Sequence, residues 1–177
     1  LIQRPVYYPF ADSIQQQKRV VVNSPLQLRD GRYEIDFADF ERKAASPRCR
    51  AFVLSNPHNP VGRVYTEEEL RRVGEICRRH HVFVIADEIH SDLIFPGHQH
   101  IVFASLGQDY AENCAVCHAP SKTFNLAGLS FSCIMIPNEE RRKRFDQMFA
   151  RYCRAHPNFF APVAAKAAWD HGEAWLD

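Results

Sequence analysis

Three short segments of the sequence contain side chains that could do chemistry, and each follows an apolar run. In residues 55–62, two prolines restrict the backbone of a loop and two asparagines offer side-chain donors. Asp87 and Glu88 place two carboxylates at the end of a run that is otherwise apolar. Residues 120–128 place Lys122 among small and apolar residues. If the apolar runs are strands of one sheet, all three segments lie where such sheets bind their ligands.

Lys122 is the candidate nucleophile. Five of the 22 Lys and Arg residues are lysines, and the other four lie in segments with a surface pattern: Lys18, Lys43, Lys143 and Lys166. Desolvation lowers the pKa of a lysine amine and makes it a nucleophile for Schiff-base chemistry, which an arginine cannot perform. A loop lysine whose stem packs on the protein while its ammonium reaches water explains the spacing equally well.

Asp87 is the candidate partner of a positive group. A carboxylate at the end of a buried strand is costly unless a cation compensates for the lost water. A helix N-cap or a structural ion pair with an arginine would also explain this residue, and the loop at residues 55–62 alone is typical of a plain turn. Glu88 is expected to face the opposite side of the strand, because side chains alternate along a strand.

The predicted elements place these segments at one edge of a sheet. Residues 51–54 and 82–86 are apolar without alternation, which indicates strands covered on both faces, as in a parallel sheet. Between them a helix begins after Thr66, where Glu69 completes a capping box. The sequence also predicts strands at residues 19–22, 114–118 and 131–136 and helices at residues 35–45, 138–152 and 161–175. We therefore predict an α/β fold with a mostly parallel sheet sandwiched by helices.

Length and composition restrict the class of protein. The chain has 177 residues and a formal net charge of +1, so it fits one domain and lacks the positive charge typical of nucleic-acid binders. It contains no apolar run of about 18 residues and no signal-peptide pattern, so we expect a cytoplasmic protein without a membrane partner. Because it begins at Leu1 inside an apolar stretch, we expect a fragment of a longer protein.

The cysteines, histidines and glycines suggest no further site. Six cysteines lie in apolar stretches, which favours buried, reduced thiols over a disulfide framework. Cys114 and Cys117 have a metal-like spacing, but their side chains point to nearly opposite faces of a strand, so we expect no metal. Histidines are expected at a helix end in residues 80–81 and in a surface loop in residues 98–100. No Gly-x-Gly occurs, which excludes the dinucleotide and P-loop fingerprints.

Three motifs follow one another in the order of a known enzyme family. They are Asn-Pro-His-Asn-Pro-Val-Gly at residues 56–62, Asp-Glu-Ile-His at 87–90 and Ser-Lys-Thr-Phe-Asn-Leu-Ala-Gly at 121–128. Together they resemble the fold type I enzymes that use pyridoxal 5'-phosphate (PLP), in the class I/II aminotransferase superfamily. Within it, Asp-Glu-Ile-His is similar to the carbon–sulfur β-lyase branch, the cystathionine β-lyases of the MalY/PatB type.

The resemblance implies a domain organisation as well as a cofactor. Residues 1–177 would form the central part of the large PLP-binding domain of an aspartate-aminotransferase-like fold. The N-terminal segment and the C-terminal small domain of that fold would be absent, so we expect the fragment alone to be inactive. The full-length protein is expected to be a homodimer.

The resemblance assigns the central chemistry to Lys122 and Asp87. It implies that Lys122 is the Schiff-base lysine and that Asp87 pairs with the pyridinium nitrogen of the cofactor. A pyridinium that a carboxylate keeps protonated is an electron sink, and it would be the cation that a buried Asp87 needs.

Four further cofactor contacts are implied in the same way. Asn59 would hydrogen-bond the ring hydroxyl, and Tyr7 would stack on the ring face. Ser121 would reach the phosphate. His90 stands where many aminotransferases have a tyrosine, and it completes the expected cofactor-binding set.

The reaction that the resemblance implies is β-elimination from a sulfur amino acid, which gives a thiol, pyruvate and ammonia. A class I/II aminotransferase is the near alternative, because both reactions begin with removal of the Cα proton. A non-catalytic fragment is the alternative of a different class.

Overall fold

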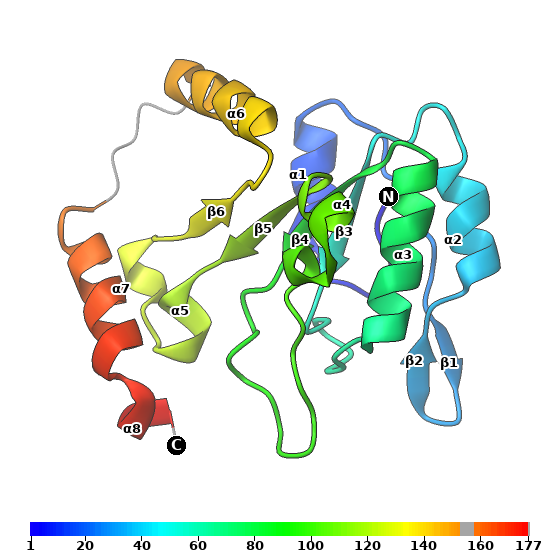
Figure 1. The fold of residues 1–177 in the computed structure, drawn as a ribbon. Helices are drawn as coiled ribbons and strands as arrows, with labels where there is room; N and C mark the ends of the chain where they lie inside the picture. The colour runs from blue at the N-terminus through cyan, green and yellow to red at the C-terminus, as the bar shows by residue number, and fades with distance from the viewer. Residues whose placement is uncertain (153–157, 177) are drawn as a thin grey trace.

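The computed structural model describes residues 1–152 and 158–176, which are built around a four-stranded sheet (Figure 1). In hydrogen-bonded order, the strands are β3 (Ala51–Ser55), β4 (Phe83–Asp87), β5 (Cys114–His118) and β6 (Cys133–Met135). The first three are parallel, and β6 pairs with β5 in the antiparallel direction. The predicted α/β fold with a mostly parallel sheet is confirmed, although the predicted strand at residues 131–136 forms only a short edge.

Helix α3 (Glu67–Arg79) connects β3 to β4 and begins at the predicted capping box. The Thr66 hydroxyl accepts a hydrogen bond from the Glu69 backbone N–H at 3.2 Å, and the Glu69 carboxylate accepts one from the Thr66 N–H at 2.9 Å. The helix buries one apolar stripe, which consists of Leu70, Val73, Ile76 and Cys77. This stripe fixes the helix against the sheet and thereby fixes the loop that precedes it.

The two faces of the central strands differ in burial. The fully buried face consists of Phe52, Leu54, Val84 and Ala86, and the half-buried face consists of Ala51, Val53, Phe83 and Ile85. The sequence predicted cover on both faces, and the structure shows complete cover on one face only. The reason is that Val53 and Ile85 line a cavity of about 840 Å³ on the other face, together with Val22.

The predicted strand at residues 19–22 is wrong. This segment forms only an isolated bridge between Ile2 and Asn23, and the Val20 side chain is 72% exposed. The Ile2 N–H donates to the Val22 carbonyl at 2.9 Å, so the segment lies beside the N-terminal residues and not within the sheet. The sequence also missed helix α1 (Pro9–Gln16), which follows the Tyr7–Tyr8 pair.

The remaining elements are short or lie at the periphery. A hairpin turns at Asp30 and Gly31, and two 3₁₀ helices lie beside α4 and α5. In chain order these elements are β1 (Gln27–Arg29), β2 (Arg32–Glu34), α2 (Phe37–Ala44), η1 (Phe103–Leu106), α4 (Gln108–Ala111), α5 (Pro120–Thr123), η2 (Ala127–Leu129), α6 (Glu139–Tyr152), α7 (Phe160–His171) and α8 (Glu173–Leu176). In the part of the chain that the structure describes, no helix is long and apolar enough to cross a membrane.

The five cysteines of the described residues are free thiols that are buried or half-buried. Cys49, Cys77 and Cys114 are buried free thiols, and Cys117 and Cys133 are half-buried free thiols. Cys153 lies outside the described residues. Among residues 1–152 and 158–176, no group of three or more His, Cys, Asp or Glu side chains could hold a metal ion.

Candidate functional site

The carboxyl ends of β3, β4 and β5 meet at one edge of the sheet, as predicted. Ser55 pairs with Asp87, and Asp87 pairs with Cys117, so the three strands end in register. The Asn56 N–H donates to the Asp87 carbonyl at 3.0 Å, and the Glu88 N–H donates to the Cys117 carbonyl at 2.9 Å. The loops that carry the candidate residues therefore leave the sheet side by side.

Asp87 ends β4 with a half-buried carboxylate. Burial raises the pKa of Asp87, and this effect is opposed by a hydrogen bond from the Ile89 N–H at 3.2 Å and by the nearby His90 and His118 imidazoles. Among the described residues, no arginine forms an ion pair with Asp87, and no helix begins at it. The two structural alternatives for this carboxylate therefore find no support.

Lys122 lies on α5, the single helical turn that follows β5. Its side chain is exposed, so the expected desolvation of the amine is wrong for these residues, because the short helix buries only Pro120 and Thr123. Burial lowers the pKa of His90, and the Lys122 ammonium lowers it further. The charges of Asp87 and Lys122 therefore both act on His90, the first raising its pKa and the second lowering it.

Three of the other four lysines have carboxylate partners, whereas Lys18, like Lys122, has none among the described residues. Lys43 lies 2.6 Å from Asp39, Lys143 lies 2.6 Å from Glu139, and Lys166 pairs with Asp170. Within the described ranges, Lys122 has neither a carboxylate nor a hydrogen-bond partner.

The polar groups at this edge fall into a set that has protein partners and a set that is accessible to water and has none in the described part of the chain. The Asn56 amide and the Glu88 carboxylate are buried, and each has protein partners. By contrast, within residues 1–152 and 158–176, no protein group hydrogen-bonds the Asn59 amide, the Ser121 hydroxyl or the second oxygen of Asp87. A donor, acceptors and a cation without protein partners fit a bound group that carries charges and hydroxyls of its own.

Tyr7 lies on the N-terminal segment, ahead of α1. Tyr7 is 44% exposed. The centre of its ring lies 5.5 Å from the centre of the Phe10 ring, which it meets edge-on, and 5.8 Å from the centre of the Tyr8 ring. The ring is therefore partly accessible to solvent.

Sequence reasoning missed a buried network around Glu88. This carboxylate is 2% exposed and accepts hydrogen bonds from the Phe103 N–H at 2.8 Å and from His100 Nε2 at 3.0 Å. His100 Nδ1 in turn lies 3.5 Å from the Asn56 amide nitrogen. The prediction that His100 lies in a surface loop is wrong, because the Glu88 partnership buries it; the expected helix end at residues 80–81 is confirmed.

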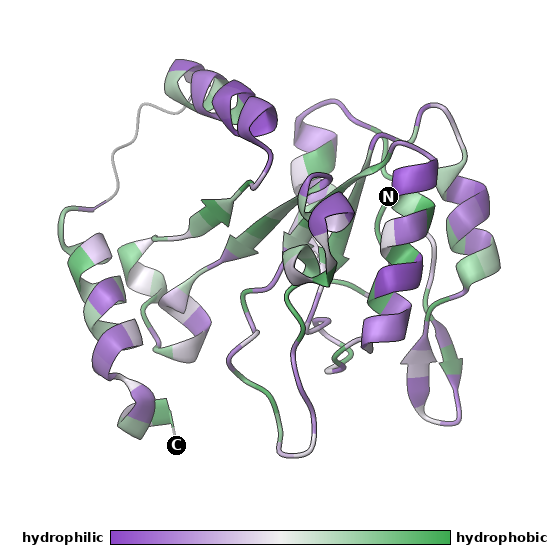
Figure 2. Cartoon of the chain, viewed as in Figure 1, coloured by the Kyte–Doolittle hydropathy of each residue, from purple (hydrophilic) through white to green (hydrophobic). Residues whose placement is uncertain are grey.

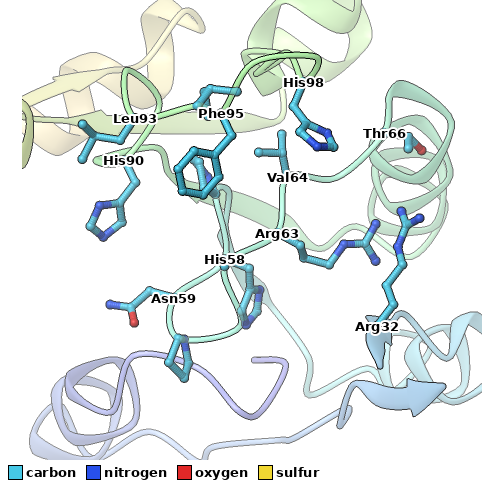
Figure 3. Close-up of a pocket in the computed structure, with 14 residues that line it drawn as sticks. Arg32, His58, Asn59, Arg63, Val64, Thr66, His90, Leu93, Phe95 and His98 are labelled. Carbon is cyan, nitrogen blue, oxygen red and sulfur yellow. The ribbon is translucent and has the colours of Figure 1, made fainter. Parts of the chain in front are cut away.

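A pocket of about 730 Å³ adjoins this edge (Figure 3). Asn59 and His90 lie together on one side of it, and Arg32 lies on the opposite side. Leu93 and Phe95, from the loop after β4, contribute apolar walls. The pocket has the volume of a small-molecule site, with a few polar groups among apolar ones.

Comparison with known proteins agrees with this geometry. The family described as aminotransferase class I and II matches residues 1–175. The chain is 45% identical over 177 residues to cystathionine beta-lyase PatB of Bacillus subtilis (strain 168). The alignment covers all of this chain and 46% of that protein.

Two solved structures extend the comparison. Cystalysin from Treponema denticola, which contains a pyridoxal 5'-phosphate cofactor, superposes with a TM-score of 0.96 at 36% identity, covering 99% of this chain and 45% of that chain. The PLP-bound C–S lyase from Staphylococcus hominis superposes with a TM-score of 0.91 at 39% identity, covering 99% and 43%. The chain thus spans less than half the length of the relatives it matches.

Proposed function

The chain belongs to the aminotransferase class I and II family, and from this premise we propose that its full-length protein is a PLP-dependent carbon–sulfur β-lyase. Its substrate would be a sulfur amino acid of the cystathionine type. Residues 1–177 would be the central part of the large PLP-binding domain. In keeping with the resemblance, we also propose that the full-length protein is a cytoplasmic homodimer.

The observation that carries this proposal is the set of polar groups at the carboxyl edge that have no protein partner among the described residues. Asp87 keeps an oxygen without a donor in a half-buried place, and Lys122 keeps an ammonium without a carboxylate in the described residues. A pyridinium nitrogen and an aldehyde are the groups that these two side chains would bind. The names of PatB, cystalysin and the S. hominis C–S lyase support the same cofactor and the same branch.

Each side chain has a definite task in this proposal. Asp87 would hold the proton on the pyridine nitrogen. Lys122 would bind the cofactor until the amine of the substrate displaces it, and its freed Nζ would then take the Cα proton of the substrate. Bound PLP supplies an electron sink for the carbanion at Cα. Loss of a thiolate from Cβ then completes the elimination.

The other proposed contacts orient the cofactor. Asn59 would donate to the ring hydroxyl, Tyr7 would cover one ring face and Ser121 would bind the phosphate. His90 would contact the cofactor from the pocket that it lines together with Asn59 (Figure 3). The residues that line this pocket do not include Tyr7, Asp87, Ser121 or Lys122.

The test is the fate of cystathionine. We expect the full-length protein, loaded with PLP, to release pyruvate, ammonia and homocysteine without any keto-acid acceptor. Lys122→Arg should abolish both the release and the visible absorbance of the lysine-bound cofactor, whereas Lys143→Arg should change neither. If turnover requires 2-oxoglutarate and produces glutamate, the enzyme is an aminotransferase. If PLP fails to bind, the proposal of a PLP enzyme is wrong.

A further inference from the structure

His58 is a buried histidine that links two segments of the proposed cofactor site. Its side chain lies between the loop after β3 and the N-terminal segment, and the residue is 2% exposed. Nε2 is 2.8 Å from the Pro5 carbonyl oxygen, and Nδ1 is 2.9 Å from the Tyr65 hydroxyl. The Tyr65 ring is itself 1% exposed and meets the imidazole edge-on at 5.8 Å.

These two partners determine the tautomer of His58. A carbonyl oxygen can only accept, so Nε2 must carry a proton and donate it to Pro5. Burial lowers the pKa of His58, so the imidazole is neutral and its Nδ1 has a free lone pair. Tyr65 must then donate its hydroxyl proton to Nδ1. Burial raises the pKa of Tyr65, which keeps that proton in place.

The nearby Arg63 guanidinium also acts on the imidazole, and its positive charge lowers the pKa of His58 further. The Arg63 guanidinium lies 4.7 Å from the centre of the Tyr65 ring and forms an ion pair with Glu69 at 2.6 Å. Arg63 also donates to the Tyr33 carbonyl at 2.6 Å. Because a nearby positive charge disfavours a second one, His58 remains the neutral link of this cluster.

His58 is close in the sequence, or through its hydrogen bond, to two residues of the proposed cofactor site. Asn59 is the next residue, and Pro5 is two residues before Tyr7. We propose that His58 is a positioning residue, held in one tautomer by Tyr65, that sets the separation between the Tyr7 ring and the Asn59 amide. This inference rests on the proposed function, which assigns both of those side chains to one cofactor ring.

The experiment uses the full-length protein and four variants: His58→Phe, His58→Gln, Tyr65→Phe and the control His81→Gln. His81 is an exposed histidine at the end of α3. In the cofactor-free protein, His58→Phe should speed hydrogen exchange of the amides in residues 6–11 by about tenfold relative to β3 and β4, because a buried hydrogen bond is lost. His58→Gln should recover part of the protection, since it retains an N–H donor.

Two further measurements report on the tautomer and the cofactor. In the wild type, ¹⁵N NMR should show His58 with its proton on Nε2 and no titration between about pH 6 and 8, whereas Tyr65→Phe should raise its pKa. In the loaded protein, His58→Phe should weaken PLP binding by about tenfold and reduce the visible circular dichroism of the cofactor, while saturating PLP still reaches Lys122.

The inference is overturned if His58→Phe leaves the exchange of residues 6–11 at the level of His81→Gln. It is also overturned if all strand amides lose protection together, because His58 would then be only a structural residue. A wild type that never binds PLP would refute the proposed function instead. In that case the exchange and NMR measurements would still decide whether His58 fixes the N-terminal segment.

Discussion

Asp87 has a carboxylate that the cofactor-free protein does not fully compensate. Burial raises its pKa above the ordinary value of 3.8, so the folded protein binds its proton more tightly than the unfolded chain does. The ionised form therefore lowers the stability of the folded protein as the pH rises from 3.8 through the folded pKa, and the penalty is constant above it. Below 3.8 both states are protonated and the penalty disappears.

We expect Asp87→Asn to stabilise the cofactor-free protein at pH 7 and to have little effect near pH 3.5. The amide removes the desolvated charge and leaves the geometry almost unchanged. The same variant should bind PLP more weakly, since it cannot compensate a pyridinium charge. Urea unfolding at both pH values checks the stability, and Asp109→Asn on the exposed surface of α4 is the control. A destabilised Asp87→Asn protein at pH 7 would contradict this account.

Glu88 differs from Asp87, because its carboxylate is buried and both of its oxygens have hydrogen-bond partners. We expect Glu88→Ala to reduce the free energy of unfolding by about 2–4 kcal/mol, since the Phe103 N–H and His100 would lose their acceptor. Glu88→Gln should lose less, because its amide oxygen can still accept one bond. Urea unfolding with Glu68→Ala, an exposed residue of α3, as control measures the difference. Equal losses for the two alanine variants would refute the structural role.

At the scale of elements, α3 packs closely against α4 and η1 at Gly74, which has no side chain. A Cβ added to Gly74 would lie 2.4 Å from Cδ1 of Tyr110 and 3.2 Å from Cζ of Phe103. The Tyr110 ring meets the Phe103 ring edge-on with 6.1 Å between the ring centres, and Cζ of Arg71 lies 5.9 Å from the centre of the Tyr110 ring. The Tyr110 ring therefore cannot move without losing these contacts.

We expect Gly74→Ala to destabilise the protein by about 1–3 kcal/mol, even though alanine favours a helix by about 1 kcal/mol over glycine. Thermal unfolding measures the effect. In a Tyr110→Ala background, the same substitution should lose most of its effect, because the clashing ring is gone. If Gly74→Ala stabilises the protein with Tyr110 present, the close packing of α3 against α4 is wrong.

The sequence predicted elements well where local signals and tertiary packing agree. In α3, the Thr66–Glu69 capping box and the apolar spacing both describe a helix that the sheet then buries. The β-branched run at residues 19–22 has the local signal of a strand, but it lies beside the N-terminal segment outside the sheet, with Val20 exposed and Val22 half-buried. A sequence pattern does not reveal which neighbour a strand-like segment meets.

In the candidate site, too, the sequence predicted the positions of residues along the elements but not their neighbours in space. Asp87 and Lys122 were predictable, because strand ends of a parallel sheet must meet at one edge. The burial of His100 was not predictable, because it depends on a contact with Glu88, 12 residues earlier in the same long loop after β4. The exposure of Lys122 was also not predictable, since it depends on what covers α5 in space.

At the scale of the whole molecule, apolar surface is concentrated on the C-terminal helices. In α6, Phe145, Met148, Phe149 and Tyr152 repeat at helical spacing and form one stripe, yet no residue of this helix is buried among the described residues. Figure 2 shows this helix with hydrophilic and hydrophobic residues side by side. An amphipathic helix with an exposed apolar stripe is typical of a surface that meets another protein surface.

We expect the 177-residue polypeptide to bind an apolar fluorescent dye and to self-associate in light scattering, because water contacts the α6 stripe. Met148→Lys combined with Phe149→Lys should reduce both signals, since two charges interrupt the stripe. Gln147→Lys combined with Ala150→Lys is the matched control, because it adds two charges to exposed positions of the same helix that are not part of the stripe. If both pairs reduce association equally, net charge and not the stripe controls it. If neither pair changes dye binding, the exposed apolar surface that matters lies on α7 and α8, where Phe160, Val163 and Trp175 are the next residues to substitute.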